Sequence, residues 1–330
     1  MGLLLPGVGC TSKGPSGPVL RVLTYSSLGS KGGFLESVGS EFQKAEGCTL
    51  IIESTLGAAQ VLSYLEEPKQ REQLDVVMGL DEILFERAKS YLDQGSISRF
   101  SLPDRWIDLV KPHLAERPGF IPMDYGALSF IYRKSDFKDG MKVPTRLADL
   151  TSPELTKKWI VQDPRASSPG LLFFLFADSI VKTKDLRKQW VTLAPSWETS
   201  YKMFLAKDAA MVWSYLSSLA YHASKGELDQ YGYVQFQEGL PIQVEGMGIV
   251  SKPGDPAKAN PCIEKWIHFV LEPGIQARLV AKQFMMPVIQ GVTLPKYFDA
   301  VPKIKPSSPL DMTPSKVDEF VNHFGKEVSG

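Results

Sequence analysis

Short β-branched runs alternate with amphipathic segments in the N-terminal part of the chain, and this alternation most limits the possible folds. Residues 19–25 (VLRVLTY), 48–53 (CTLIIE) and 75–78 (DVVM) have the composition of strands. Apolar residues at helical spacing predict helices over 34–45 and 57–66. Strand–helix–strand order predicts a parallel sheet covered by helices.

The pattern changes at residue 121, where a long extended segment begins and runs to residue 132. Further strands are predicted over 158–162, 210–215 and 242–250, and helices over 81–91, 168–181, 184–193, 197–206, 259–271, 274–281 and 314–324. A chain of 330 residues exceeds what one compact core usually holds. We therefore expect two α/β lobes, with the chain crossing between them at 121–126 and again near 238–245.

Charge and motifs exclude several classes of function. The chain has 37 basic and 37 acidic residues, so it lacks the excess of positive charge that nucleic-acid backbones or anionic membranes attract. No apolar run approaches the ~20 residues that a membrane-spanning helix needs. The GxxxxGK[ST], HExxH, GxSxG and GxGxxG signatures are absent, as is any CxxC pair. We expect no nucleic-acid partner, no metal site and no enzyme.

The first ten residues, MGLLLPGVGC, resemble the end of a bacterial lipoprotein signal, with Cys10 as the lipid-anchor residue. The alternative is a disordered cytosolic N-terminus. Residues 11–18 (TSKGPSGP) have the composition of a flexible tether. The two other cysteines, Cys48 and Cys262, either pair in an exported protein or remain free buried thiols, and the sequence leaves this open.

Seven blocks of the chain carry a specific resemblance. They are LTYSS (23–27), DVVMGLD (75–81), PMDYGALSFIYRK (122–134), VQDPRASSPGL (161–171), SWETSYKMFL (196–205), SYLSSLAYH (214–222) and MMPVIQGVTLP (285–295). In this order they resemble the periplasmic thiamine-binding proteins that feed ABC importers, a branch of the type II periplasmic binding protein fold. The resemblance covers most of the chain from about residue 20 to residue 300.

The resemblance implies a fold of two α/β lobes with a ligand cleft and hinge crossovers. Its expected divisions are 1–18 as signal and tether, 19–122 as the first part of lobe 1, 123–240 as lobe 2, and 241–330 as the return to lobe 1 with the C-terminal helices. It implies a monomeric periplasmic or lipid-anchored solute-binding protein that delivers thiamine, thiamine monophosphate or thiamine diphosphate to an ABC permease. No cofactor and no catalytic residue are expected.

Thiamine carries a permanent thiazolium charge, which aromatic ring faces attract by ~1–2 kcal/mol each when desolvated. The resemblance implies that Tyr25, Trp197, Tyr215 and Tyr221 contact this ligand from both lobes. Tyr25 and Tyr215 end predicted strands, where open α/β sheets bind ligands. Without the resemblance, such aromatic residues are more often core residues with a satisfied polar tip.

A second set of candidates lies at predicted helix starts. Ser167 and Ser168 precede Pro169 and start a helix whose exposed N–H groups favour an anion, so they are expected at the phosphate end of the ligand. The alternative is an ordinary helix cap. Gly57 starts another helix and would let the ligand approach closely.

The chain departs from the family pattern at several positions. Ser26 replaces an acidic residue of the usual TYDS motif, the loop at 29–33 lacks its aromatic residue, Leu56 replaces the acid before Gly57, and Phe284 replaces a tryptophan. Ser26 and Phe284 stay in the expected ligand site. Asp124 and Glu245, near the predicted crossovers, are candidate replacement carboxylates, or else members of surface or hinge salt bridges.

These departures leave other ligands open, namely a pyrimidine fragment, another organic cation or a ferric ion. The absence of a Tyr-Tyr pair disfavours iron, and the lost acidic residues disfavour a polyamine. A thiamine-metabolism enzyme on this fold would need a nucleophile, but no Cys-His or Ser-His arrangement is evident. A sensor module with the same lobes is not distinguished from a transport protein.

Overall fold

The computed structural model describes residues 17–329, with gaps at residues 56, 96–97, 99, 139, 187–188 and 253–259. Cys10, the predicted lipid-anchor residue, lies outside the described residues together with the rest of 1–16. None of the described helices is both long enough and apolar enough to cross a membrane.

Ten strands of the described chain form one continuous sheet, in the order β2-β1-β3-β9-β4-β7-β5-β6, with β8 and β10 paired to β4. They are β1 Val19–Tyr25, β2 Thr49–Thr55, β3 Val76–Asp81, β4 Ile121–Arg133, β5 Trp159–Gln162, β6 Trp190–Ala194, β7 Met211–Tyr215, β8 Tyr231–Tyr233, β9 Ile242–Ile249 and β10 Met286–Pro287. Parallel pairs form at each end, β1 with β2 and β3, and β5 with β6 and β7. The strands β4 and β9 run antiparallel between them.

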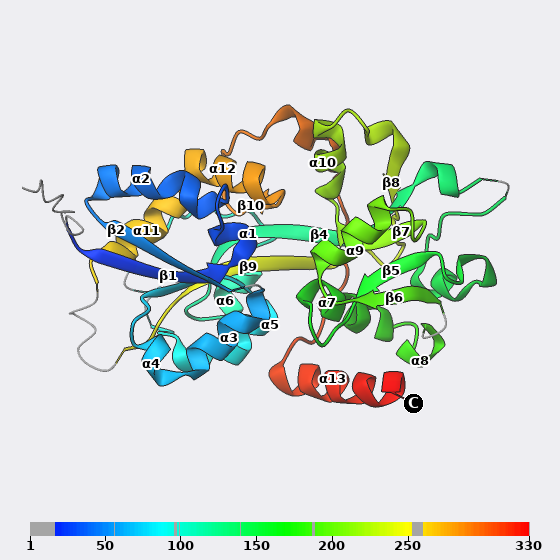
Figure 1. The fold of residues 1–330 in the computed structure, drawn as a ribbon, viewed down its shortest axis with the longest axis horizontal. Helices are drawn as coiled ribbons and strands as arrows, with labels where there is room; N and C mark the ends of the chain where they lie inside the picture. The colour runs from blue at the N-terminus through cyan, green and yellow to red at the C-terminus, as the bar shows by residue number, and fades with distance from the viewer. Residues whose placement is uncertain are drawn as a thin grey trace, which may run out of the picture.

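The helices cover both faces of each parallel group. The α-helices are α1 Ser26–Gly29, α2 Phe34–Glu46, α3 Ala58–Glu66, α4 Pro68–Arg71, α5 Glu82–Ala88, α6 Lys111–Glu116, α7 Ser168–Asp178, α8 Thr183–Leu186, α9 Trp197–Leu205, α10 Ser218–Ser224, α11 Cys262–Val270, α12 Pro273–Gln283 and α13 Pro314–Ser329. Short 3-10 turns are η1 Lys89–Tyr91, η3 Lys134–Asp136, η4 Leu147–Thr151, η5 Pro153–Leu155, η6 Leu228–Gln230 and η8 Lys296–Ala300. In the first lobe α2, α11 and α12 lie on one side of the sheet and α3, α4 and α5 on the other (Figure 1).

Two separate hydrophobic cores confirm the predicted pair of α/β lobes. The first core joins β1, β3 and β9 to α2 and α11, with Phe42 packed edge-on against Trp266 at 4.9 Å between ring centroids. The second core joins β4, β5 and β7 to α7, and Phe130 lies at its centre against Trp159, Phe173 and Trp213. Such aromatic clusters bury large areas and fix ring geometry, so each lobe has its own stable centre.

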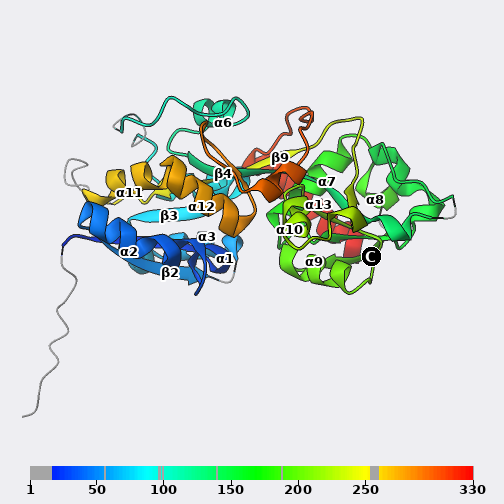
Figure 2. The same ribbon diagram turned by 90° about the horizontal axis from the view of Figure 1, so that it is seen from above.

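The strand β4 carries the chain from one lobe to the other. Ile121 and Met123 at its start belong to the first core, whereas Leu128 and Phe130 belong to the second. Figure 2 shows β4 and β9 running side by side through the region between the lobes. The extended segment predicted from residue 121 is thus one strand, and the chain crosses at the predicted position.

The C-terminal helix α13 lies under the second lobe (Figure 1). Its Val317, Phe320 and Phe324 join the second core, and Phe324 packs 4.8 Å from Phe174 between ring centroids. An ion pair between Arg87 of α5 and Asp318 of α13 also ties this helix to the first lobe. The last segment therefore contacts both lobes.

The helix predicted over 184–193 is wrong. The described residues of this segment form the short helix α8 and the strand β6, which pairs parallel with β5. The helical prediction came from polar residues of good helix propensity, but the Trp190–Ala194 run (WVTLA) is β-rich, and pairing with β5 overrides the weak local preference. The remaining predicted strands and helices differ from the observed ones mainly at their ends.

Cys48 and Cys262 form a disulfide, with Cα atoms 6.0 Å apart. It joins the residue before β2 to the first turn of α11, both in the first core. The sequence left pairing and free thiols open, because only the fold shows that α11 packs against α2 and β1, next to the start of β2. The bridge closes a loop with a sequence separation of 214 residues.

Replacing both cysteines with alanine should lower the free energy of unfolding by about 2–5 kcal/mol, because the open chain regains the entropy of a long loop. Urea unfolding of the oxidised wild type and of the C48A/C262A double variant measures this difference. Adding a thiol reductant should destabilise the wild type and leave the double variant unchanged. Equal stability of the oxidised wild type and the double variant would contradict a bridge that stabilises the first lobe.

Candidate functional site

The carboxyl ends of the parallel strands carry most of the predicted ligand residues. In the first lobe Tyr25 ends β1, Thr55 ends β2 just before Gly57, and Asp81 ends β3. In the second lobe Tyr215 ends β7, and the α7 start at Ser168 follows β5. Ligands of open α/β sheets bind at such strand ends. We call the region formed by these strand ends and the middle of β4 and β9 the interlobe site.

Tyr25 lies flat against its neighbouring strand. Its ring occupies the space where a side chain on Gly79 would stand, and Gly79 has a φ of +86°, so both geometry and space require glycine there. The Tyr25 hydroxyl donates a 2.6 Å hydrogen bond to Glu245 Oε2 on β9. Burial and then the charge of Glu245 raise the pKa of Tyr25 well above its usual value. Tyr25 therefore remains a neutral donor at the interlobe site.

Tyr215 occupies the matching position in the second lobe. Its ring fills the space over Gly126 of β4, and its hydroxyl donates to Gln243 Oε1 on β9 at 2.7 Å. Burial, followed by the charges of Glu245 and Asp81, raises the pKa of Tyr215 well above its usual value. The two tyrosines thus bind through their hydroxyls to side chains of the same strand, β9, from opposite lobes.

Trp197 begins α9 beside Tyr215, and the ring centroids are 6.4 Å apart. Ser196 caps this helix by accepting from the Thr199 N–H at 3.1 Å. The Trp197 indole N–H donates to Ser214 Oγ at 2.8 Å, and the ring stacks on Tyr201 at 5.2 Å. Trp197 is 36% exposed, which is unusual for a large apolar ring fixed in this way. It presents an aromatic face beside Tyr215.

A buried histidine supports this aromatic group. The Tyr201 hydroxyl lies 2.8 Å from His222 Nε2, and His222 stacks on Tyr231 at 3.5 Å between centroids. His222 is fully buried, and burial lowers its pKa, against an opposing effect of Glu227. Neither Tyr201 nor His222 was expected at the site from the sequence, although both lie inside the quoted blocks.

Tyr221 and Phe284 form a second aromatic pair. Their ring centroids lie 5.7 Å apart in an edge-to-face arrangement, with Tyr221 from α10 and Phe284 from the end of α12. Phe284 ends α12 in a left-handed conformation with φ of +52°, which a bulky residue seldom adopts. The following residue, Met285, reaches the space beside Gly126 that Tyr215 also contacts. The pair therefore lies next to the interlobe site.

The helix-start candidates lie at the same strand ends. Ser167 precedes α7 in an extended conformation, and its side chain does not cap the helix. Ser168 lies near Asp81 of the first lobe, and its hydroxyl opposes the rise in the pKa of Asp81 that burial causes. Gly57 precedes α3, with open space where a side chain would stand. Ser26 is half-buried and follows Tyr25 directly.

Three carboxylates face one another across β3, β9 and β4. Glu245 pairs with Asp81 on one side and with Asp124 on the other, and directly paired residues point to the same face of a sheet. Burial, followed by the charges of Asp81 and Glu82 and against the Tyr25 hydrogen bond, raises the pKa of Glu245 to about 8. Burial and the charge of Glu245 raise the pKa of Asp124 well above its usual value. The two residues suggested as replacement carboxylates thus lie together beneath Tyr25.

Two residues of the interlobe site were missed. Gln243 and Glu82 had no motif of their own. The Asp81 carboxylate accepts from the Ile83 and Leu84 N–H groups at 2.9 Å and so caps α5. Gln243 enters the site through the register of β9 against β4, which pairs it with Gly126. No local pattern in the sequence could reveal this pairing.

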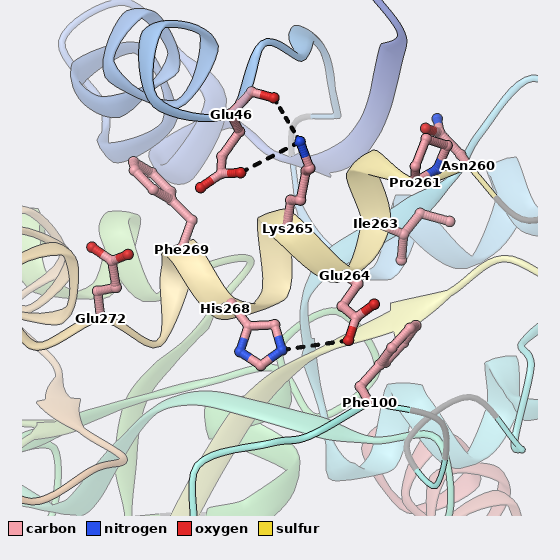
Figure 3. A pocket seen from close by; sticks show the side chains of 10 residues that line it. All are labelled: Glu46, Phe100, Asn260, Pro261, Ile263, Glu264, Lys265, His268, Phe269 and Glu272. Carbon is pink, nitrogen blue, oxygen red and sulfur yellow. Dashed lines mark hydrogen bonds and ion pairs between the residues drawn. The ribbon is translucent and has the colours of Figure 1, made fainter.

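A hollow of about 550 Å³ lies elsewhere, on the first lobe beside α11 (Figure 3). Four of its charged residues form two ion pairs, Lys265 with Glu46 at 3.6 Å and His268 with Glu264 at 3.7 Å. None of the residues that line it belongs to the interlobe site.

Comparison with known proteins gives a consistent result. Residues 75–313 match the family of bacterial extracellular solute-binding proteins. The thiamine-binding periplasmic protein of Escherichia coli is 29% identical over 93% of this chain and 91% of its own length, and that of Salmonella typhimurium is 30% identical over the same shares. A solved structure of a periplasmic thiamin binding protein superposes with a TM-score of 0.76 at 27% identity and full coverage of both chains. The predicted resemblance and the predicted fold class are confirmed.

The raised pKa of Glu245 makes the stability of the ligand-free protein depend on pH. The folded carboxyl group keeps its proton up to about pH 8, whereas the unfolded one loses it near 4.5. The contribution of Glu245 to the free energy of unfolding is therefore largest below pH 4.5, and it is lost as the pH rises towards 8. The free energy of unfolding of the wild type should therefore fall between pH 5.5 and pH 8.5. We expect this fall to be smaller in E245Q by roughly 1–3 kcal/mol.

Urea unfolding of the wild type and of E245Q at several pH values gives this difference directly. The exposed Glu319 of α13 provides a matched control, because E319Q makes the same chemical change far from buried charge. Parallel stability curves for the wild type and E245Q would show that Glu245 titrates normally.

Proposed function

The chain belongs to the family of bacterial extracellular solute-binding proteins, and we propose that it captures thiamine or a thiamine phosphate between its lobes for an ABC permease. Its relatives of 29% and 30% identity are named for thiamine binding and for the periplasm. Chains that share such identity over nine-tenths of their length keep the architecture of the site, whereas the ligand depends on individual side chains.

The observation that carries this proposal is the acidic pair Asp124–Glu245 lying beneath aromatic side chains. Both carboxylate oxygens of Asp124 are buried and have no hydrogen-bond partner in the structure. No arginine, lysine or histidine is paired with Asp124 or Glu245 in the described part of the chain. A buried acidic site without a counter-charge favours a cation.

The aromatic residues suit the shape and charge of thiamine. Tyr25 donates to Glu245, Trp197 lies beside Tyr215, and Tyr221 with Phe284 extends this aromatic group. Ring faces attract a fixed cation without proton transfer, and they also stack on a flat pyrimidine ring. The substitutions at Ser26 and Phe284 remove an acid and a larger ring, and Asp124 and Glu245 supply the acidic charge from β4 and β9 instead.

The serine start of α7 is the proposed place for a phosphate group. The first N–H groups of a helix lack partners within the helix and attract anions. Ser167 and Ser168 are half-buried there, opposite the first lobe. The anionic and cationic ends of thiamine phosphate would then lie on α7 and on the acidic pair.

Binding and release, rather than catalysis, is the proposed activity. The family is one of solute-binding proteins, and no residue of the interlobe site pairs a nucleophile with an activating base. The Cys48–Cys262 disulfide fits an oxidising compartment such as the periplasm. A lipid anchor at Cys10, a monomeric state and delivery to a permease remain parts of this proposal.

Truncating Tyr215 or Tyr221 to alanine should weaken thiamine binding by ~1–3 kcal/mol, the scale of a lost cation–π and stacking contact. Isothermal titration of thiamine into each variant gives the change, starting from a wild-type dissociation constant below roughly 1 μM, or ~8 kcal/mol. The matched control is Y233A, because Tyr233 lies on β8 and contacts Gln235 rather than the interlobe site. Unchanged affinity in both variants would refute the aromatic cage.

The phosphate assignment predicts a change that depends on the ligand. S168A should weaken thiamine monophosphate by about 1 kcal/mol, because a hydrogen bond to a charged group is lost, and should leave thiamine nearly unaffected. Titration of both ligands into wild type and S168A gives the comparison. An equal loss for both ligands would mean that Ser168 acts through Asp81 and not on phosphate.

A further inference from the structure

We propose that Asp124 and Glu245 share one proton in the ligand-free protein, and that a bound cation displaces this proton. The pair thereby becomes the element that selects fixed cations over neutral molecules of the same shape. This inference rests on the proposed function, because it assigns a role within the same site.

The geometry of the pair is the first support. Asp124 of β4 and Glu245 of β9 are opposite each other in an antiparallel ladder, so their side chains leave the same face as close neighbours. The Asp124 carboxyl group is fully buried, and neither of its oxygens accepts a hydrogen bond. Two carboxylates this close in a dry place do not both ionise, because each charge raises the cost of the other.

Among the described residues, the neighbours of the pair bring no positive charge against this repulsion. Tyr25 from β1 donates its hydroxyl to Glu245, whereas Asp81 from β3 and Glu82 from α5 add negative charge. Tyr215 from β7 and Pro287 from β10 are uncharged neighbours. His113 of α6 faces Glu82, with its Nδ1 3.1 Å from Glu82 Oε1.

A proton or a cation is therefore needed to balance the pair. Burial raises the pKa of Glu245 to about 8, so near neutral pH the proton is present. When a fixed cation binds, its charge replaces the proton, which leaves to the solvent and is taken up by buffer. A neutral ligand cannot make this exchange and leaves the proton in place.

The number of protons released per bound ligand can be measured. Titration calorimetry of thiamine at pH 7 in buffers of different ionisation enthalpy should give release of roughly one proton per ligand. The affinity should rise up to about tenfold per pH unit between pH 6 and 7.5 and level off above pH 8. A thiamine analogue with a neutral thiophene in place of the thiazolium ring should bind more weakly, with no proton release and no pH slope.

Two isosteric variants test the assignment to these side chains. In D124N one of the two carboxyl groups that share the proton is gone, so thiamine should still bind but proton release should fall by at least half. In E245Q both proton release and cation selectivity over the thiophene analogue should decrease. The control E319Q should match the wild type, and thermal melting establishes that each variant is folded.

The outcomes separate this inference from the proposed function. Tight thiamine binding with no proton release in the wild type would overturn the shared proton and leave the function intact. Unchanged proton release in folded D124N and E245Q would overturn the assignment to this pair. No binding of thiamine to the wild type would instead reject the proposed function.

Discussion

The antiparallel pairing of β4 with β9 is the constraint on which the arrangement of both lobes depends. The first residues of β4 belong to one hydrophobic core and its last residues to the other, so the two cores are fixed relative to one strand. Where β4 passes from one core to the other, neither lobe alone surrounds the side chains. Asp124 and Glu245 lie at this change, which allows polar groups to remain where a single core would exclude them.

Much of the fold could be predicted from the sequence because its elements are strongly periodic. The run at 19–25 alternates, the apolar spacing of 34–45 is helical, and both became elements with nearly those bounds. The helix predicted over 184–193 is wrong because the polar first half has good helix propensity, whereas pairing with β5 decides the structure of the β-rich end. The disulfide likewise depends on the packing of α11 against α2 and β1, which no local pattern contains.

The residues of the candidate site were likewise only partly predictable from the sequence. Tyr25, Trp197, Tyr215 and Tyr221 could be named from the resemblance, since each lies in a quoted block. Their supports could not: Gly79 beneath Tyr25, Gln243 beside Tyr215 and the Tyr201–His222 contact all follow from register or from helix packing. Asp124 and Glu245 were suggested as single acids, but their facing arrangement follows from the β4–β9 ladder.

Placing the acidic pair on the crossing strands has an energetic consequence for a binding protein. A ligand can favour one arrangement of the lobes only by its difference in affinity between arrangements. Buried carboxylates without a counter-charge raise the free energy of the ligand-free protein. A bound cation removes this cost, and this relief adds to the energy of its direct contacts. Tyr25 and Tyr215 each reach β9 through a hydroxyl from opposite lobes, and a cation between their rings would interact with both lobes at once. Recognition of charge and contact between the lobes then depend on the same few side chains.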